Sequence, residues 1–432
     1  MTTTPTPART EVLVIGAGPA GSAAAAWAAR SGRDVVLADA AVFPRDKTCG
    51  DGLTPRAIGE LERLGLGDWV RAHTVNHGLR AHGFGQTLLL PWPGPGKSGT
   101  GLPAYGSAVA RTELDDHLRT SAIKAGAVGL DGARAVDVRR DGGRVEAVVL
   151  RRDGEDVEIA CDHLVVADGV RSPLGRKLGR EWHRETVYGV AARSYVDSDR
   201  SEDPWISSHL ELRGPSTGSG TGGEGTATRG EILSGYGWIF PLGDGQVNIG
   251  VGTLATARRP AEMALRPLME FYADERREEF ALHGDLRAPT SALLPMGGAV
   301  SNVAGPNWAL IGDAAACVNP LNGEGIDYGL ETGRLVVDLI EDGADLASAW
   351  PALLREHYGE AFSIARRLAG LVTVPRLLPT LGPVGMRSDW LMTLALRWMG
   401  NLVTDEDRDR AARVWRWAGR RSVRLDDRPP FS

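Results

Sequence analysis

Short apolar runs near the N-terminus predict the first structural elements of the chain. Residues 11–15 form a run that suits a buried parallel strand, and the small residues over 20–31 suit a helix. A second strand is expected over 34–38, which completes a strand–helix–strand unit. Another helix and strand are expected within 116–138, and a further buried strand over 160–167. This order is typical of a parallel sheet covered by helices.

From about residue 181 the pattern changes to β-branched and aromatic strands separated by turns. These strands predict an antiparallel sheet that forms a substrate domain, and they cover 187–196, 207–212, 235–241 and 247–251. The buried-strand pattern returns over 308–313, after which helices are expected to dominate to the C-terminus.

One segment, 214–230, has almost no apolar residue and is predicted to be a mobile hairpin insertion. It contains a formal GxGxxG pattern at Gly218, Gly220 and Gly223. No strand precedes that pattern and no helix follows it, so it reflects composition rather than a nucleotide site.

Composition then narrows the class of protein. The 432 residues suffice for two or three domains, and 42% hydrophobic with 24% charged residues is ordinary for a soluble globular protein. A formal net charge of −6 argues against nucleic acid as a partner. The three cysteines form no CxxC pair, which argues against a disulfide scaffold and fits a reducing compartment. His183 and His209 stand apart from other ligands, so no metal is expected.

A dinucleotide fingerprint lies between the first predicted strand and helix, where Gly16, Gly18 and Gly21 form GxGxxG. The first glycine allows a tight turn, the second lets backbone approach a pyrophosphate, and the third permits close helix packing. Asp39 ends the second strand, where its carboxylate can accept hydrogen bonds from a ribose. The fingerprint predicts a dinucleotide on the helix N-terminus but does not choose between FAD and NAD.

Two later segments indicate FAD rather than NAD. Asp168-Gly169 follows one predicted strand, and Gly312-Asp313 ends another. With the first motif they resemble the three signatures of the para-hydroxybenzoate-hydroxylase-like FAD fold. The resemblance implies that Asp313 holds the ribityl chain, that the helix after Gly323 points at the flavin pyrimidine ring, and that Arg111 lies near the cofactor. Taken alone, each aspartate could equally be a strand-end cap.

Further segments resemble the geranylgeranyl reductase family over nearly the whole chain. They are 43–53 with its Cys-Gly-Asp-Gly turn, 236–241, 247–252, 291–298, 319–326 and 428–431. Within the family, the pattern is most similar to the actinobacterial members that saturate an isoprene unit of the menaquinone tail. The resemblance implies FAD as cofactor, held by Gly16, Ala17, Gly18, Pro19, Ala20, Gly21, Asp39, Ala40, Arg45, Cys49, Gly50, Asp51, Gly52, Arg111, Ala135, Asp168, Gly169, Gly312, Asp313, Pro320, Gly323, Glu324, Gly325 and Ile326.

The implied fold class is α/β (α+β). A para-hydroxybenzoate-hydroxylase-like, Rossmann-type FAD-binding domain is joined to an antiparallel β-sheet substrate domain and a C-terminal helical region. The FAD-binding domain is expected to be discontinuous, over 8–80, 101–180 and 290–340. The substrate domain is expected over 81–100 and 181–289, and the helical region over 341–432.

Reduction of a prenyl chain sets the chemical requirements of the site. An isolated trisubstituted alkene is not electrophilic, so its reduction by flavin hydride also requires a proton source. Catalytic roles are expected for Cys49, Tyr236 and Trp238, and a substrate pocket is expected to include Phe240, Pro241 and Asn248. The three aromatic residues alternate along one strand and so face one side, either as a wall beside the flavin or as a sandwich core. Cys49 is either the proton donor or a contact that sets the shape of the site.

Other functions stay open on the same sequence. They are reduction of geranylgeranyl lipids or diphosphates, FAD-dependent aromatic hydroxylation, and non-catalytic binding of prenyl lipids. A halogenase of this fold would carry WxWxIP where 236–241 reads Tyr-Gly-Trp-Ile-Phe-Pro, which counts against that activity.

The expected partners are a reductant, a lipid substrate and a membrane surface. No second believable nucleotide fingerprint is present, so electrons are expected from NAD(P)H that visits transiently or from a protein electron donor. A prenylated quinone or other polyprenyl lipid lies in a bilayer. Residues 368–403 combine apolar stretches with arginines and tryptophans, which suits an interfacial amphipathic region or a helical cap on the FAD domain. The predicted location is cytoplasmic, peripheral on the cytoplasmic face of the cell membrane.

Overall fold

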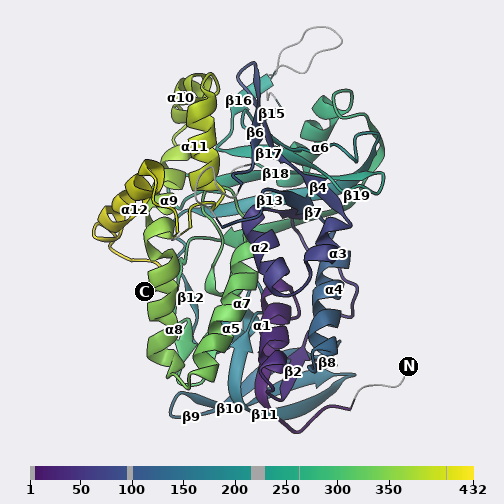
Figure 1. Cartoon of the computed structure of the whole chain (residues 1–432), viewed down its shortest axis with the longest axis vertical. Helices are drawn as coiled ribbons and strands as arrows, with labels where there is room; N and C mark the ends of the chain where they lie inside the picture. The colour runs from purple at the N-terminus through teal and green to yellow at the C-terminus, as the bar shows by residue number, and fades with distance from the viewer. Residues whose placement is uncertain (1–4, 95–100, 216–228, 262, 405) are drawn as a thin grey trace.

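The computed structural model describes residues 5–94, 101–215, 229–261, 263–404 and 406–432 (Figure 1). Its larger sheet has eight strands: β1 (Arg9–Ile15), β2 (Val35–Ala38), β8 (Val128–Leu130), β9 (Arg134–Asp141), β10 (Arg144–Arg152), β11 (Glu155–Val166), β21 (Ala304–Gly305) and β22 (Trp308–Leu310). The order is β21-β22-β11-β1-β2-β8, and β10 and β9 extend the sheet from β11. The central pairs β22/β11, β11/β1, β1/β2 and β2/β8 are parallel, so their carboxyl ends meet at one edge.

Helices α1 (Pro19–Arg30), α4 (Arg111–Lys124) and α5 (Pro173–Lys177) contact strands of this sheet. Helix α7 (Ile326–Glu341), which follows a 3-10 turn η1 (Gly312–Ala315), packs on α1; α2 (Pro55–Arg63) packs on α7, and α3 (Gly67–Arg71) on α2. Helix α1 packs between α4 and α7. It is built from small residues because α7 crosses it closely. A Cβ on Gly333 of α7 would lie 2.6 Å from the backbone oxygen of Ala20.

A second sheet of seven strands follows the order β19-β13-β18-β17-β14-β5-β6. Its strands are β5 (Gly78–Gly83), β6 (Gln86–Pro91), β13 (Tyr188–Ser198), β14 (Ile206–His209), β17 (Gly235–Pro241), β18 (Gln246–Ala255) and β19 (Leu282–Pro295). Every neighbouring pair is antiparallel except β14 and β5. Helix α6 (Leu265–Arg276) covers one face and buries Leu268 and Tyr272 against it.

Three small sheets accompany the two large ones. They are β3 (Gly52–Leu53) with β7 (Gly106–Ala108) and β4 (Thr74–Asn76), β12 (Glu181–Trp182) with β20 (Val300–Ser301), and β15 (Arg213–Pro215) with β16 (Arg229–Ile232). Strand β3 of the first small sheet directly follows the loop that carries Cys49, and its pairing with β7 anchors the C-terminal end of that loop.

The C-terminal region is helical: α8 (Leu346–Leu354), a π turn (Arg355–Gly359), α9 (Glu360–Val372), α10 (Leu377–Gly385), α11 (Asp389–Met399) and α12 (Arg410–Val423). In Figure 1, α10 and α11 lie at one end of the long axis and β9 and β10 lie at the other. Among the described residues, every helix is too short or too polar to cross a membrane.

Two predicted domain boundaries fall inside strands. The pairing of β5 with β14 begins at Leu79, before the boundary expected at residue 81, and β19 pairs with β13 as far as Pro295, beyond the one expected at 290. Strand pairing therefore crosses both of these expected boundaries. The division into domains stays a prediction. Residues 216–228 of the expected insertion lie outside the described part of the chain.

Candidate active site

Two glycines of the fingerprint occupy positions where no side chain fits. At Gly16, φ is +102° and a Cβ would lie 2.3 Å from the backbone oxygen of Ala167. At Gly21, a Cβ would lie 1.8 Å from the backbone oxygen of Gly16, so α1 can approach β1 this closely only with glycine there. Gly18 precedes α1, and no side chain caps the helix. The first turn therefore keeps backbone N–H groups free for an anion.

Asp39 ends β2 and organises the same turn. Its Oδ2 accepts the N–H of Ala17 at 2.7 Å, and its Oδ1 accepts the N–H of Ala41 at 2.8 Å. Each carboxylate oxygen retains a second lone pair, so the group can still accept a ribose hydroxyl.

Two arginines face the turn and share one buried aspartate. Nε and Nη2 of Arg111 each lie 2.7 Å from a carboxylate oxygen of Asp115, and Nη1 of Arg45 lies 2.6 Å from Asp115. Although burial opposes it, the Asp115 carboxylate raises the pKa of Arg111. Two guanidinium groups with one carboxylate carry a net positive charge, which suits a pyrophosphate.

The two later aspartates have different surroundings. Oδ2 of Asp168 accepts the N–H of Leu174 at 2.8 Å, so this residue does act as a cap for the start of α5. Its Oδ1 has no hydrogen-bond partner in the described part of the chain. Asp313 accepts a hydrogen bond from Nζ of Lys47 at 2.8 Å.

Most of these groups line one cavity of about 1190 Å³. Small-ligand sites occupy roughly 300–1,000 Å³, so this one has room for more than one small ligand. The predicted site residues that line it are Gly16, Gly18, Pro19, Ala20, Asp39, Ala40, Arg45, Cys49, Gly50, Asp51, Gly52, Arg111, Ala135, Asp168, Gly169, Tyr236, Trp238, Phe240, Gly312, Asp313, Gly323, Glu324, Gly325 and Ile326.

Five predicted residues do not line the cavity. Ala17 and Gly21 lie behind the turn, where their contacts are with Asp39 and Gly16. Pro241 and Asn248, expected to form the substrate pocket, do not line it either, and Pro320 is also absent from its wall. Asn248 lies behind Trp238 and accepts the indole N–H at 2.8 Å, so its role is to hold that ring.

The loop of residues 46–52, which carries Cys49, is held by the second sheet. Arg193 of β13 is fully buried and its Nη2 donates to Oδ1 of Asp46 and, at 2.9 Å, to the backbone oxygen of Lys47. Nδ2 of Asn248 donates to the backbone oxygen of Cys49 at 2.9 Å. The position of the thiol is therefore set by β13 and β18.

Asp51 is fully buried in this loop, with φ at +64°. Its Oδ2 accepts hydrogen bonds from the hydroxyl of Tyr195 at 2.7 Å and from Asn248 at 2.8 Å, whereas Oδ1 has no partner among the described residues. Burial raises the pKa of Asp51 to about 6, and these hydrogen bonds and the charges of Arg193 and Arg111 act in the opposite direction.

Three aromatic side chains of β17 form one wall of the cavity. The ring centroids of Tyr236 and Trp238 are 5.9 Å apart, and those of Trp238 and Phe240 are 6.3 Å apart. A Cβ on Gly50 would lie 3.2 Å from Nε1 of Trp238, so the glycine lets the Cys49 loop approach the rings. The hydroxyl of Tyr236 donates to the backbone oxygen of Asn322.

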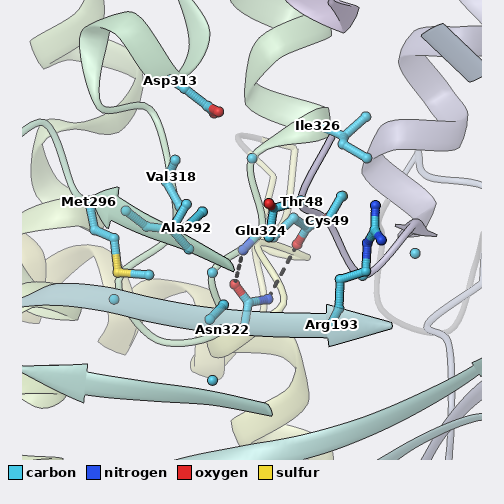
Figure 2. A pocket seen from close by; sticks show the side chains of 18 of the residues that line it. Thr48, Cys49, Arg193, Ala292, Met296, Asp313, Val318, Asn322, Glu324 and Ile326 are labelled. Carbon is cyan, nitrogen blue, oxygen red and sulfur yellow. Dashed lines mark hydrogen bonds between the residues drawn. The ribbon is translucent and has the colours of Figure 1, made fainter. Parts of the chain in front are cut away.

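Glu324 lies on the loop before α7 and lines the cavity (Figure 2). Thr54 Oγ1 donates to its Oε1, and Asn322 Nδ2 lies 3.3 Å from its Oε2. Burial, and then the neighbouring charge of Asp327, raise the pKa of Glu324 well above its ordinary value.

The opposite end of the cavity is apolar and is formed largely by the C-terminal helices. Leu377 and Leu381 of α10, Met392 and Leu396 of α11, and Phe84 next to β5 line it. A Cβ on Gly382 would lie 2.2 Å from the Phe84 ring, so the glycine lets α10 close against the second sheet. The cavity is thus continuous from a polar, dinucleotide-binding end to an apolar one.

The residues present fit FAD. An uncapped α1 N-terminus, paired arginines, and a ribose-accepting Asp39 lie in sequence along one end of the cavity. Ile326 begins α7, whose N-terminal N–H groups would stabilise negative charge on a reduced flavin ring.

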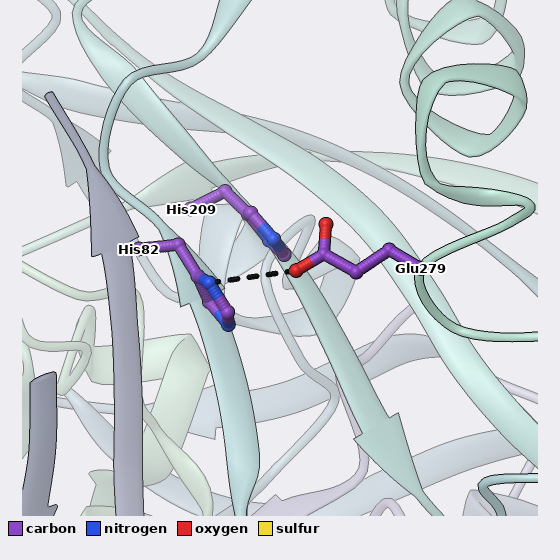
Figure 3. Close-up of side chains that lie close together, drawn as sticks. All are labelled: His82, His209 and Glu279. Atoms are coloured by element: carbon purple, nitrogen blue, oxygen red, sulfur yellow. Dashed lines mark ion pairs between the residues drawn. The ribbon is translucent and has the colours of Figure 1, made fainter. Parts of the chain in front are cut away.

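His82, His209 and Glu279 form a group outside this cavity that could suggest a metal site (Figure 3). The two imidazole rings are stacked, with centroids 4.4 Å apart and planes at 10°, so their nitrogen lone pairs lie in two nearly parallel planes and cannot both point at one ion. Nδ1 of His209 is occupied by the Tyr272 hydroxyl at 2.6 Å. Burial lowers the pKa of both histidines; the charge of Glu279 opposes this for His82, and the neighbouring His82 adds to it for His209. The group suits core packing better than a cation.

Several residues of the site were not predicted. Arg193 and Tyr195 act from a strand without a motif, through contacts with residues far away in the sequence. Thr54 lies in the segment 49–56, which resembles the family, but its contact with Glu324 was not predicted. The apolar pattern of 368–403 signalled the C-terminal helices, but not that they line the same cavity as the fingerprint.

Known proteins resemble this chain over nearly its full length. The family model described as "FAD binding domain" matches residues 9–219. Menaquinone reductase of Mycolicibacterium smegmatis is 63% identical over 98% of this chain and 99% of its own, and that of Mycobacterium tuberculosis is 61% identical over 98% of each. A geranylgeranyl bacteriochlorophyll reductase-like protein of Thermoplasma acidophilum has the same fold, with a TM-score of 0.72 at 21% identity, over 94% of this chain and 98% of that one.

These findings confirm the predicted fold class, the predicted FAD and the predicted resemblance. The family match covers the strands and turns that hold Gly16, Asp39 and Asp168, and the high identity extends over the rest of the cavity. This chain is an FAD-dependent oxidoreductase and belongs to the menaquinone reductase family.

Proposed function

We propose that this protein saturates an isoprene double bond of a prenyl chain, and that its substrate is the side chain of menaquinone. The observation that carries the proposal is the single cavity that joins the FAD end to an apolar end lined by α10 and α11. A long apolar chain fits that end, and the quinone name of the relatives at 61–63% identity supports the choice of lipid.

Different residues along the cavity have different roles in the proposed reaction. FAD, held by the α1 turn, Asp39 and the paired arginines, supplies a hydride when reduced. The Tyr236–Trp238–Phe240 wall excludes water and offers aromatic faces to positive charge that develops on an alkene carbon. Asn248 fixes the Trp238 ring and the Cys49 loop together, so the wall and the loop keep one geometry. The electrons come from NAD(P)H that binds transiently or from a protein donor.

Contact with a membrane would let the substrate enter from lipid. Helix α10 has no buried residue, yet its Leu377 and Leu381 line the cavity. Leu381 is 56% exposed, Val384 60% and Trp390 71%, so large apolar side chains surround this end of the cavity. An exposed apolar group of this kind suits insertion at the headgroup level of a bilayer.

Helix α12 adds a charged surface that suits the same partner. Its exposed residues repeat with helical spacing and form the basic face: Arg410, Arg413, Val414, Trp417, Arg420, Arg421, Arg424 and Leu425. No acidic residue occurs over 410–425. Arginines mixed with exposed apolar side chains favour a peripheral position on an anionic lipid surface.

Anaerobic turnover tests the proposed reaction. The flavoprotein is reduced with dithionite, mixed with menaquinone, and the product mass is measured. After the quinone ring has been reoxidised in air, a gain of two hydrogens in the side chain is expected, and unchanged side-chain mass would rule the reaction out. A geranylgeranylated lipid run in parallel separates the two prenyl substrates. Aromatic hydroxylation would instead require oxygen and add one oxygen atom.

A further inference from the structure

Three carboxyl side chains at or beside the cavity have no part in the function proposed above. Glu324 precedes α7, and Asp327 and Glu331 lie in its first turns. Glu331 has a counter-ion, because Nη2 of Arg56 lies 3.1 Å from each of its oxygens. Although burial opposes it, Arg56 holds the pKa of Glu331 below its ordinary value, so this residue is the charged member of the group.

The other two carboxyl groups have no counter-ion in the described part of the chain. Asp327 is fully buried: Asn401 Nδ2 donates to its Oδ2 at 2.7 Å, and Oδ1 has no hydrogen-bond partner among the described residues. Glu324 receives hydrogen bonds from Thr54 and Asn322, and Figure 2 shows Asn322 bonded to both its backbone and its side chain. Only Glu324 of the three lines the cavity.

Two interacting carboxyl groups without a counter-ion cannot both ionise at low cost. Tyr236, Tyr328 and Arg56 are the other titratable groups that face them, and Arg56 is already bound to Glu331. Burial raises the pKa of Asp327 to about 6, and burial, then the charge of Asp327, raise the pKa of Glu324 well above its ordinary value. The pair therefore keeps a proton at neutral pH, and the member at the cavity holds it.

We propose that Glu324 is the acid that protonates the isoprene double bond, with Asp327 as a positioning residue that keeps it protonated. This inference rests on the proposed function. One alkene carbon accepts hydride from the reduced flavin, and the other takes the proton as the Glu324 O–H bond breaks. The π bond is consumed, the product gains two hydrogens, and Glu324 becomes a carboxylate that recovers its proton from water. The two electrons come from the reductant, which is dithionite in the test below.

The test uses the intact flavoprotein and an isosteric variant, Glu324→Gln. Single-turnover saturation of the side chain, followed by product mass, is expected to slow by about 100-fold or more, because a positioned acid contributes 10²–10⁴-fold. The infrared band of a protonated carboxyl group at pH 7 is expected to disappear in the same variant, while bound FAD is retained. Glu324→Asp should keep the carboxyl band and restore part of the rate. Asp342→Asn, exposed at the other end of α7, serves as the matched control and should match the wild type.

The outcomes separate the two proposals. A wild-type rate in Glu324→Gln, or a carboxyl band that persists in it, overturns the assignment of Glu324. A Cys49→Ala variant that alone loses the rate would assign the proton to the thiol instead. If the wild type adds no hydrogen to the side chain, the proposed function fails and the donor assignment fails with it, whatever the infrared band shows.

Discussion

Asp51 is a buried carboxyl group whose proton is held more tightly in the folded chain than in the unfolded one. Its pKa is raised from 3.8 to about 6, so the folded state binds more protons between these values and the free energy of unfolding falls as pH rises through them. Asp51→Asn should keep the acceptor for Tyr195 and Asn248 and remove the charge. We expect the variant to be more stable than wild type above pH 6, by up to about 3 kcal/mol, and equal near pH 4.

Thermal unfolding of the flavoprotein from pH 4 to pH 8 measures this difference. A variant that is less stable at pH 8 would show that the ionised Asp51 carboxylate is compensated in the folded chain.

A substitution at Gly21 tests whether FAD binding depends on the close approach of α1 to β1. Gly21→Ala places a Cβ 1.8 Å from the backbone oxygen of Gly16, so α1 must move away from β1. We expect the purified variant to lose most of its bound FAD, measured as flavin absorbance per protein. Gly370→Ala is the matched control, because a Cβ there meets nothing within 4 Å and alanine favours a helix.

The residue scale also shows where prediction from sequence succeeds. Gly16, Gly21 and Asp39 were identifiable because their roles depend on the turn between neighbouring elements, which spacing reveals. Asn248 was assigned to the substrate pocket, yet its side chain bonds to Trp238 and Asp51 behind the wall. The direction of the Asn248 side chain depends on which face of β18 meets the Cys49 loop. No local sequence pattern indicates which face that is.

At the scale of elements, α10 limits the width of the apolar end of the cavity. Gly385 lines it, and the nearest atom to a Cβ there would be Sδ of Met392 at 3.9 Å, so the space beyond is open. Gly385→Phe should fill that space and hinder a long prenyl chain more than a short one. We expect the ratio of turnover on long-tail to short-tail menaquinone to fall about tenfold or more, since about 1–3 kcal/mol separates ligands that differ by a small apolar group in a tight pocket.

Gly385→Ala, which adds one methyl group in open space, should leave that ratio unchanged. An equal loss on both substrates in Gly385→Phe would place the tail elsewhere. The sequence predicted helices here from their apolar spacing, but not their contact with β5 and β6, because that packing joins segments about three hundred residues apart.

For the whole molecule, the central question is whether the apolar end of the cavity and the lipid-facing surface work as one unit. Trp390, Val384 and Leu381 lie near that end, and the basic face lies on α12. In Figure 1 both surfaces lie away from β9 and β10, which are at the opposite end of the long axis from α10 and α11. A charge change on β9 should therefore not affect lipid binding.

Sedimentation with phosphatidylglycerol and phosphatidylcholine vesicles measures that binding directly. Arg413→Glu with Arg421→Glu should weaken binding to the anionic vesicles by about 30-fold or more, because each arginine near the surface contributes about 1 kcal/mol. Arg140→Glu on β9 is the matched control and should bind as the wild type does. Equal binding by the double variant would exclude α12 from the lipid contact.

Turnover then distinguishes docking from catalysis. Val384→Ser with Trp390→Ser should lower the reduction of menaquinone embedded in vesicles, because the apolar end of the cavity no longer meets the lipid. The same variant should reduce short-tail menaquinone in detergent at the wild-type rate, because neither side chain lines the cavity. Product mass in both media provides the measurement.

A parallel loss of activity in detergent would mean that these residues stabilise the fold, whereas full activity in vesicles would mean that the substrate enters by another route. The difference expected between the two media follows from one arrangement. The residues that would hold FAD lie at the parallel sheet, and the helices that complete the same cavity are the ones that expose apolar side chains.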